Sequence, residues 1–204
     1  MLNQILTLLA DGRFHSGDDL GAELGVSRAA VWKHIKKLEE LDVPISSVKG
    51  KGYRLHDDIE LLDPDVIRAQ LSHRLDRLDT LLTVDSTNTY LLEQAADHMG
   101  KRFAALAEMQ TGGRGRRGRH WVSPFGKNIY LSLLVTLPGE VGQQFGLSLV
   151  TAIAVEQALT KQGIDGISLK WPNDVYLNGR KLAGILLEAR QSQPGFCQVV
   201  IGIG

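Results

Sequence analysis

The sequence predicts an α+β fold in two parts, a small helical unit with a β-hairpin followed by a larger domain built on a mixed or antiparallel sheet. Three observations favour this fold. Apolar residues recur at helical spacing through the first part, and a Gly-rich basic turn then separates two short strand-like segments. From about residue 80 onward, strand-like and helix-like segments mix irregularly. The chain has 204 residues, 43% of them apolar, which suffices for one or two packed domains.

Three helices are expected at the N-terminus. The first covers about residues 1–10, where apolar side chains recur every three or four positions. Ser16 is a suitable N-cap for a second helix over 17–24, and Gly25 permits a tight turn after it. A third helix over 28–41 carries an apolar stripe on one face. That stripe consists of Val31, Ile35, Leu38 and Leu41.

Two short strands, about 45–48 and 52–55, are expected after the third helix, joined by the basic glycine turn. Two helices joined at a tight glycine turn, with a hairpin behind the second, are typical of a winged helix-turn-helix. We therefore assign residues 1–60 to a winged helix-turn-helix DNA-binding domain.

Charge supports DNA binding by this unit. The whole chain carries 23 basic and 23 acidic residues, so any electrostatic function is local. Residues 1–27 have a net charge of −3, whereas residues 28–54 hold seven basic residues against three acidic ones, a net +4. The candidate DNA-binding residues are Ser27, Arg28, Ala29, Trp32, Lys33, Lys36 and Lys51. The alternative is a protein–protein module whose lysines are merely solvated.

Residues 61–78 are expected to form a linker and a connecting helix, with Asp63 as N-cap and Pro64 at the first helical position. The second domain covers residues 79–204. Its expected strands are 80–84, 104–108, 128–137, 167–171 and 196–204, with a hairpin over 175–190 that turns at Asn178-Gly179. One helix is expected over 90–99 and a deeply buried one over 145–159. Because the chain ends in an apolar run, we expect the sequence to be cut within a domain.

Several classes of protein are excluded by composition. The single cysteine, Cys197, rules out an internal disulfide framework and a cysteine metal cluster, and the six histidines show no metal-ligand spacing. We therefore expect no metal held by protein ligands. The N-terminus lacks the features of a signal peptide and is too short in apolar length to span a bilayer. These features are typical of a cytoplasmic protein that does not bind membranes.

The stretch GGRGRRGRHW (112–121) contains the spacing G-x-G-x-x-G. A dinucleotide fingerprint requires a helix directly afterwards, but here glycines and a proline lead into a strand, and bulky arginines would crowd a pyrophosphate. A localisation or heparin patch, or a solvated charge run, needs no glycines at fixed steps. Flexible backbone combined with permanently charged guanidinium groups instead predicts a loop that closes over an anionic ligand.

Two further polar clusters support an anion site. DSTN (85–88) lies at a strand-to-helix junction and has more polar residues than a helix cap needs. KWPND (170–174) leaves a strand, and the following hairpin returns with Lys181, which we expect to be partly enclosed and to require an anion. A plain helix cap and a surface lysine are the alternatives, and the role of Lys170 stays open between an edge charge and a carboxylate contact.

Three motifs in this order, DSTN, GRGRRGRxW (113–121) and KWPND…KLAG (170–184), resemble the biotin protein ligase family. With the winged helix-turn-helix in front, the whole chain is similar to the bifunctional bacterial ligases that also repress the biotin operon. The resemblance implies a catalytic domain similar to class II aminoacyl-tRNA synthetases. It also implies that the C-terminal part of that domain and a small β-barrel domain are missing from this sequence.

The activity implied by the resemblance is ATP-dependent formation of biotinyl-5′-adenylate and transfer of biotin to a lysine of the biotin carboxyl carrier protein of acetyl-CoA carboxylase. The implied cofactors are biotin, ATP and Mg²⁺. The implied partners are that carrier protein, operator DNA and, when adenylate is bound, a second copy of the chain. Fixed cations suit this chemistry, because two anions must meet and the transition state adds charge at phosphorus.

The resemblance also implies site residues. Arg116 and Lys181 are the implied catalytic residues. The implied biotin-binding residues are Ser86, Thr87, Asn88, Gln110, Arg114, Gly115, Arg116, Lys181 and Gly184. The implied adenylate and phosphate contacts are Arg116, Arg117, Arg119, Trp121, Asn173 and Asp174. Two alternative functions remain, a DNA-binding regulator that senses a small molecule without catalysis and a lipoate-type ligase.

Overall fold

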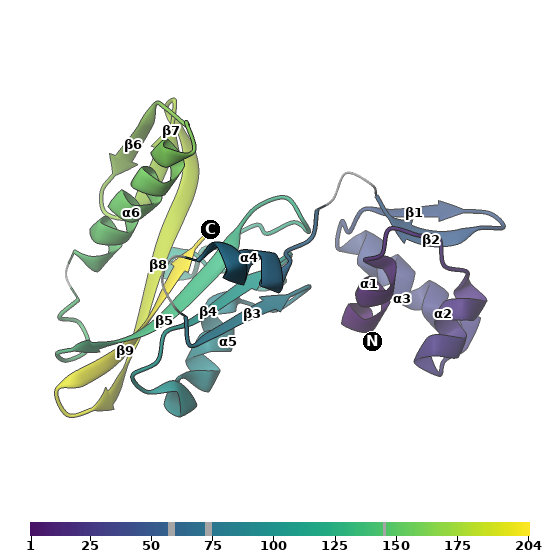
Figure 1. Cartoon of the computed structure of the whole chain (residues 1–204), viewed down its shortest axis with the longest axis horizontal. Coiled ribbons are helices and arrows are strands. Elements are labelled where there is room, and N and C mark those ends of the chain that lie inside the picture. The colour runs from purple at the N-terminus through teal and green to yellow at the C-terminus, as the bar shows by residue number, and fades with distance from the viewer. Residues whose placement is uncertain (57–59, 72–74, 145) are drawn as a thin grey trace.

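The computed structural model of the chain describes residues 1–56, 60–71, 75–144 and 146–204. Residues 57–59 of the expected DNA-binding domain, residues 72–74 of the expected linker and connecting helix, and Phe145 at the start of an expected helix lie outside them. The N-terminal unit consists of α1 (Leu2–Leu9), α2 (Gly17–Leu24), α3 (Arg28–Glu40), β1 (Ile45–Val48) and β2 (Gly52–Leu55). β1 and β2 form an antiparallel hairpin beside the three helices (Figure 1).

The boundary of α2 confirms the predicted cap, and α3 begins at a serine cap of the same kind. Ser16 Oγ accepts the backbone N–H of Asp19 at 3.0 Å, and Ser27 Oγ accepts that of Ala30 at 3.2 Å. Gly25 ends α2 in the left-handed region, with φ of +66°, where a side chain would be strained. The short turn between the two helices is thus determined by the left-handed glycine that ends α2 and the serine cap that begins α3.

The core of the N-terminal unit lies between its three helices and the hairpin. Its fully buried side chains are Ile5, Leu6, Leu9, Val31, Ile35 and Leu38. These residues occupy the stripes that the helical spacing predicts. The cluster also includes Met109 and Phe125 of the second domain, so the two parts of the chain share apolar contacts.

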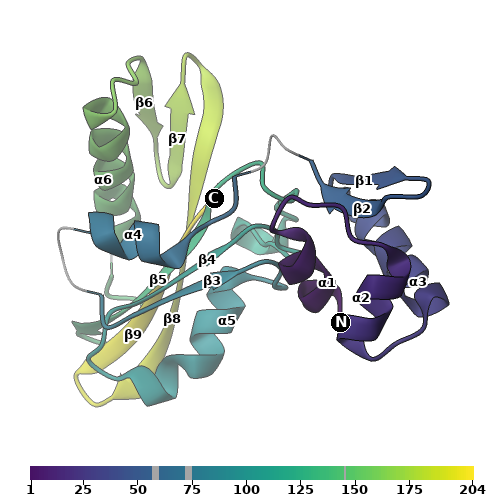
Figure 2. The same cartoon turned by 45° about the vertical axis from the view of Figure 1, so that its right-hand side comes forward.

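The second domain is built on a seven-stranded mixed sheet in the order β3-β4-β5-β9-β8-β7-β6 (Figure 2). The strands are β3 (Arg77–Leu81), β4 (Phe103–Ala107), β5 (Tyr130–Pro138), β6 (Ile167–Lys170), β7 (Asp174–Leu177), β8 (Arg180–Gln193) and β9 (Phe196–Ile203). β3 and β4 are parallel, and each of the other neighbouring pairs is antiparallel. This is the mixed α+β sheet that the sequence predicts.

Two helices pack on this sheet. α5 (Thr87–Gln94) contacts β4, β5 and β9, and α6 (Leu147–Lys161) contacts β6, β7 and β8. Alternate residues of β9 join different apolar clusters, Val200 with α5 and Val199 and Ile201 with α6. Because successive strand residues point to opposite faces, the two helices cover opposite faces of the sheet. α4 (Pro64–Gln70) precedes the sheet, with Asp63 as its N-cap.

Some predicted elements are wrong in position. The strand expected over 80–84 is β3, which begins at Arg77 and ends at Leu81 because it pairs with Phe103–Ala107 of β4. The helix expected over 90–99 is α5, which begins at Thr87, followed by the short 3₁₀ turn η1 (Ala95–His98).

The prediction of a deeply buried helix over 145–159 is also wrong. In α6 only Thr151 and Ala152 are buried, while Leu149, Val150 and Ile153 are 41%, 61% and 39% exposed. The helix packs one face on the sheet and presents its other apolar residues outward. Within the described ranges, no helix combines the length and hydropathy needed to cross a membrane.

Candidate functional site

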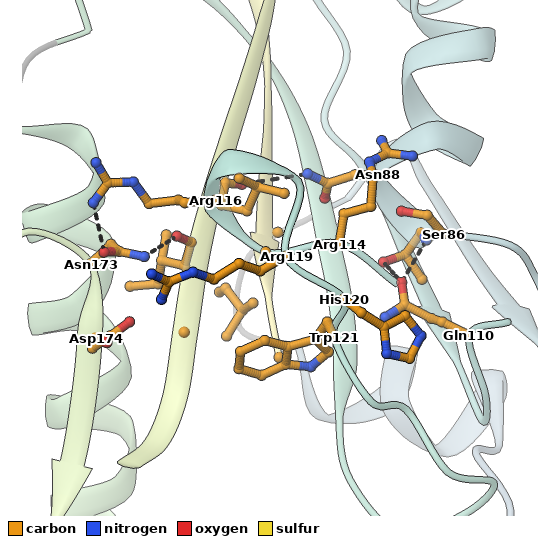
Figure 3. Close-up of a pocket in the computed structure, with 18 of the residues that line it drawn as sticks. Ser86, Asn88, Gln110, Arg114, Arg116, Arg119, His120, Trp121, Asn173 and Asp174 are labelled. Atoms are coloured by element: carbon orange, nitrogen blue, oxygen red, sulfur yellow. Dashed lines mark hydrogen bonds between the residues drawn. The ribbon is translucent and has the colours of Figure 1, made fainter. Parts of the chain in front are cut away.

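A cavity of about 360 Å³ opens on the second domain (Figure 3). Three stretches of chain line it: the segment that begins α5, the arginine–glycine loop (112–121), and the β7–β8 hairpin with the preceding turn. The end of β9 completes the wall. This one cavity is lined by all of the predicted ligand-contacting residues. They are Ser86, Thr87, Asn88, Gln110, Arg114, Gly115, Arg116, Arg117, Arg119, Trp121, Asn173, Asp174, Lys181 and Gly184.

The floor of the cavity is made of buried polar side chains. Ser86, Thr87 and Asn88 are 3–4% exposed at the start of α5. Gln110 Oε1 accepts the backbone N–H of Thr87 at 2.9 Å and lies 3.1 Å from Thr87 Oγ1. Ser132 Oγ of β5 lies 2.6 Å from Asn88 Oδ1 and 2.7 Å from Thr87 Oγ1. The floor is therefore pre-organised by neighbouring side chains, and Ser86 additionally caps α5.

The arginine–glycine loop folds back on itself over the cavity. Trp121 N–H donates to Gly113 O at 2.9 Å, and Gly115 N–H donates to Arg119 O at 2.7 Å. Arg117 and Gly118 turn the chain with φ of +59° and +70°. The loop thereby presents its arginines on both sides of one short turn (Figure 3).

Two cations of the site are held by the opposite wall. Arg116 Nη1 donates to Asn173 Oδ1 at 2.9 Å, and Asn173 Nδ2 donates to Ile185 O at 2.9 Å. Lys181 Nζ lies 2.8 Å from Asp174 Oδ1 and 5.2 Å from the centre of the Trp121 ring. The Lys181 side chain is 40% exposed, so it lines the cavity as an exposed cation that a ligand can reach.

Glycines make room for Trp121 and Asn88. A Cβ at Gly184 would lie 3.1 Å from the Trp121 ring, and a Cβ at Gly202 would lie 2.4 Å from Asn88 Oδ1. Real Cβ contacts essentially never fall below 3.0 Å. The Asn88 amide can therefore occupy its observed position only because Gly202 lacks a side chain, whereas a side chain at Gly184 would require the indole to shift by a few tenths of an ångström.

Sequence reasoning missed part of the cavity wall. The unpredicted lining residues are His120, Ile185, Leu186, Gly202, Ile203 and Gly204. His120 stands inside the predicted loop and could have been included from its position there. The others lie on β8 and β9, or directly after β9 in the case of Gly204, and the pairing of these segments brings them to the cavity. Within the described ranges, no group of three or more His, Cys, Asp or Glu could hold a metal ion.

The candidate DNA-binding residues lie apart from the cavity, on α3 and the β1–β2 turn. Trp32 is 55% exposed on α3, and Lys33, Ala29 and Lys51 are also exposed. Two of the cations already have acidic partners. Arg28 Nη1 lies 3.1 Å from Asp18 Oδ2, and Lys36 Nζ lies 2.6 Å from Glu39 Oε2. Ser27 serves as the cap of α3 and is exposed.

Comparison with known proteins agrees with this division of the chain. Residues 81–204 match the biotin/lipoate A/B protein ligase family, and residues 1–54 match an HTH domain. The bifunctional ligase/repressor BirA of Salmonella typhimurium is 48% identical over 200 residues, which are 98% of this chain and 62% of that relative. The chain thus spans less than two thirds of the length of this relative.

Two solved structures are also similar. The biotin protein ligase from Aquifex aeolicus in complex with biotin and ATP is 35% identical, with a TM-score of 0.51 over 63% of this chain and 51% of that one. The biotin protein ligase from Leishmania major in complex with biotin is 28% identical, with a TM-score of 0.53 over 64% of this chain and 57% of that one. Since the family match covers more than half of its residues, the chain belongs to the biotin/lipoate A/B protein ligase family and carries an HTH domain at its N-terminus.

Proposed function

We propose that the chain belongs to a biotin protein ligase that also represses transcription. It would form biotinyl-5′-adenylate from biotin and ATP and transfer biotin to a lysine of a biotin carboxyl carrier protein. The observation that carries this proposal is the joining, in one cavity, of a buried polar floor and a cationic rim. The relatives named as ligase/repressors and the ligase structures with biotin and ATP support it.

The polar floor suits the ureido ring of biotin. That ring offers two N–H donors and one carbonyl acceptor, and Thr87, Asn88 and Gln110 supply complementary groups that are already held in place. A buried polar group left without a partner costs about 1–3 kcal/mol. The dithiolane ring of lipoate has no such donors or acceptor, so this floor favours biotin over lipoate.

The cationic rim suits the reacting groups. We propose that Arg114 and Gly115 contact the biotin carboxylate region and that Arg116 and Lys181 stabilise charge as the carboxylate attacks the α-phosphate and pyrophosphate leaves. The proposed contacts to the nucleotide are Arg117, Arg119, Trp121, Asn173 and Asp174, with Gly184 beside the ring of Trp121. No nucleophilic side chain is required, because the mixed anhydride is itself the activated acyl group.

Closure of the loop would protect that anhydride from water. The carrier lysine would then attack the biotinyl carbonyl and release AMP. Mg²⁺ would enter with the triphosphate and offset its charge. Because the described residues offer no cluster for a metal, we assign no protein ligand to it.

The test is incubation of the chain with biotin, ATP and an apo-carrier domain, followed by mass spectrometry. Wild type should add one biotinyl group, and Arg116→Ala and Lys181→Ala should each lose at least about 100-fold in rate. Lys161→Ala, at the exposed end of α6, is the matched control. Adenylate without transfer would still identify an activating enzyme, biotin binding without adenylate would identify a sensor, and lipoate attachment in place of biotin would overturn the proposal.

For repression, we propose that α3 and the β1–β2 turn bind operator DNA and that adenylate-bound chains pair as homodimers. The net +4 of residues 28–54 supports the DNA contact. Sedimentation with biotin and ATP tests the pairing. An unchanged monomer in the presence of bound adenylate would contradict it.

A further inference from the structure

We propose that Glu188 is a positioning residue of this site, holding the arginine–glycine loop and the biotin floor in fixed relation to each other. The proposal rests on the proposed function, since it concerns binding of the same ligand. Glu188 does not itself line the cavity, and no sequence motif includes it. It acts through Arg114 of the loop and Asn88 of the floor.

One carboxylate contacts both of these walls. Asn88 Nδ2 donates to Glu188 Oε2 at 2.8 Å. Arg114 Nη2 lies 3.3 Å from Oε1 and 3.5 Å from Oε2 of the same carboxylate. Glu188 belongs to β8 and is paired in register with Val200 of β9, so its backbone is fixed in the middle of the sheet.

The contact with Asn88 determines how its side-chain amide points. Asn88 is 4% exposed, so both ends of the amide need partners within the protein. A carboxylate can only accept, so Glu188 selects the Nδ2 end, and Oδ1 is left facing the hydroxyl of Ser132 at 2.6 Å. Glu188 and Ser132 thereby hold the Asn88 amide in one orientation at the wall of the cavity proposed for the ureido ring.

Glu188 also closes a ring of contacts, which is completed by the backbone carbonyl of Trp121 and by the loop backbone between Arg114 and Trp121. Gln110 Nε2 donates to Ser123 Oγ at 3.1 Å, and Ser123 Oγ donates to Trp121 O at 3.2 Å, at the C-terminal end of the loop. From Gln110 further contacts connect the floor residues to Glu188. Glu188 in turn contacts Arg114, in the N-terminal half of the loop. In order, the ring runs through Trp121, Ser123, Gln110, Thr87, Ser132, Asn88, Glu188 and Arg114.

The exposure of the Arg114–Glu188 ion pair indicates that Glu188 positions the loop and adds little to the stability of the fold. The side chains of Arg114 and Glu188 are 41% and 29% exposed. Ion pairs this accessible contribute little to folding, because water and salt screen them and two long side chains must be ordered. Loss of the Glu188 charge alone should therefore leave the fold intact and loosen the loop, whereas loss of the whole side chain should also weaken ligand binding.

Two substitutions distinguish the two contacts. Glu188→Gln keeps an oxygen that accepts from Asn88 but removes the charge that holds Arg114. Glu188→Ala removes both. Glu156→Ala is the control, since Glu156 accepts a hydrogen bond within α6, from Thr160 at 3.3 Å, and does not line the cavity.

Two measurements are made on the full chain, biotin affinity by calorimetry without ATP and the rate of trypsin cleavage in the arginine–glycine loop without ligand. Glu188→Ala should weaken biotin binding by about 10-fold or more and raise loop cleavage several-fold. Glu188→Gln should raise cleavage to the same degree while keeping biotin affinity within about 3-fold of wild type. The midpoint of thermal unfolding should change little in Glu188→Gln.

Unchanged cleavage in both variants, or unchanged biotin affinity in Glu188→Ala, would overturn the proposal. Should Glu188→Ala fail to fold, Glu188→Gln alone decides through the cleavage rate. If wild type binds no biotin, the proposed function fails. The cleavage rates alone then test whether Glu188 holds the loop in place.

Discussion

Glu108 shows how a single buried carboxyl group links the parts of this chain. The residue is 4% exposed, and burial raises the pKa of its carboxyl group above its ordinary value. The backbone N–H of Leu62, in the connecting segment, donates to its side chain, which offsets the effect of burial only in part. Of the next two residues, Met109 belongs to the apolar cluster of the N-terminal unit, and Gln110 contacts Thr87 in the polar floor of the cavity.

Glu108 predicts a pH dependence of stability. Because its pKa is raised in the folded state, the folded state binds the proton more tightly than the unfolded state does. The cost of ionising the buried group is absent below its ordinary pKa of 4.5 and grows until the pH exceeds the raised value. Glu108→Gln keeps a side-chain acceptor for Leu62 and removes this cost, so it should raise the unfolding temperature at pH 7 relative to wild type.

The measurement is thermal unfolding of both chains between about pH 4 and pH 8. The advantage of Glu108→Gln should shrink as the pH falls toward 4.5, while the control Glu156→Gln should show no such trend. A difference between wild type and Glu108→Gln that stays constant across this range would refute the assignment.

At the residue scale, sequence reasoning succeeded where polar residues are consecutive. Four polar residues in DSTN and the arginines between glycines stand out locally, and all of their predicted site members line the cavity. Glu188 and Gly202 give no such signal, since each stands singly between apolar residues of a long strand. Their roles depend on the β8–β9 register and on the approach of Asn88, which are tertiary facts.

At the scale of elements, the start of α3 offers a direct test of local control. Ser27→Ala removes the side chain that accepts from Ala30 N–H, and loss of an N-cap costs about 1 kcal/mol. Hydrogen exchange in the first turn of α3 should therefore accelerate about 5-fold. Ser47→Ala, at an exposed position of β1, is the control and should leave those amides unchanged. Equal exchange in Ser27→Ala and wild type would contradict the capping role.

Caps and glycines explain why the N-terminal elements were predictable to within a residue or two. The sheet domain gave less local information. β3 begins at Arg77 because that is where pairing with β4 begins, although the apolar run in the sequence lies further along. The apolar surface of α6 predicted burial on all sides, but the described part of the chain covers only one face. The hydropathy of a helix shows that apolar surface is present, but it does not show which face of the helix another segment covers.

At the scale of the whole molecule, charge is separated within a neutral chain. Positive charge gathers at α3 and the β1–β2 turn and, independently, around the cavity, while the total is zero. A neutral chain has no general attraction to polyanions, so any DNA affinity must come from the local group of cations. This makes the proposed DNA contact separable from the proposed catalytic site by substitution.

The salt dependence of DNA binding tests that separation. Each cation that neutralises a phosphate releases counterions, which contributes about 0.9 to the slope of log affinity against log salt concentration. Lys33→Ala should lower that slope by about 0.9 on a random-sequence duplex while leaving biotin affinity unchanged, and Lys161→Ala should alter neither quantity. Filter binding between about 50 and 200 mM salt provides the slopes. If Lys33→Ala and Lys161→Ala have equal slopes, α3 does not lie against the phosphates, and the positive unit is better explained as a protein-binding surface.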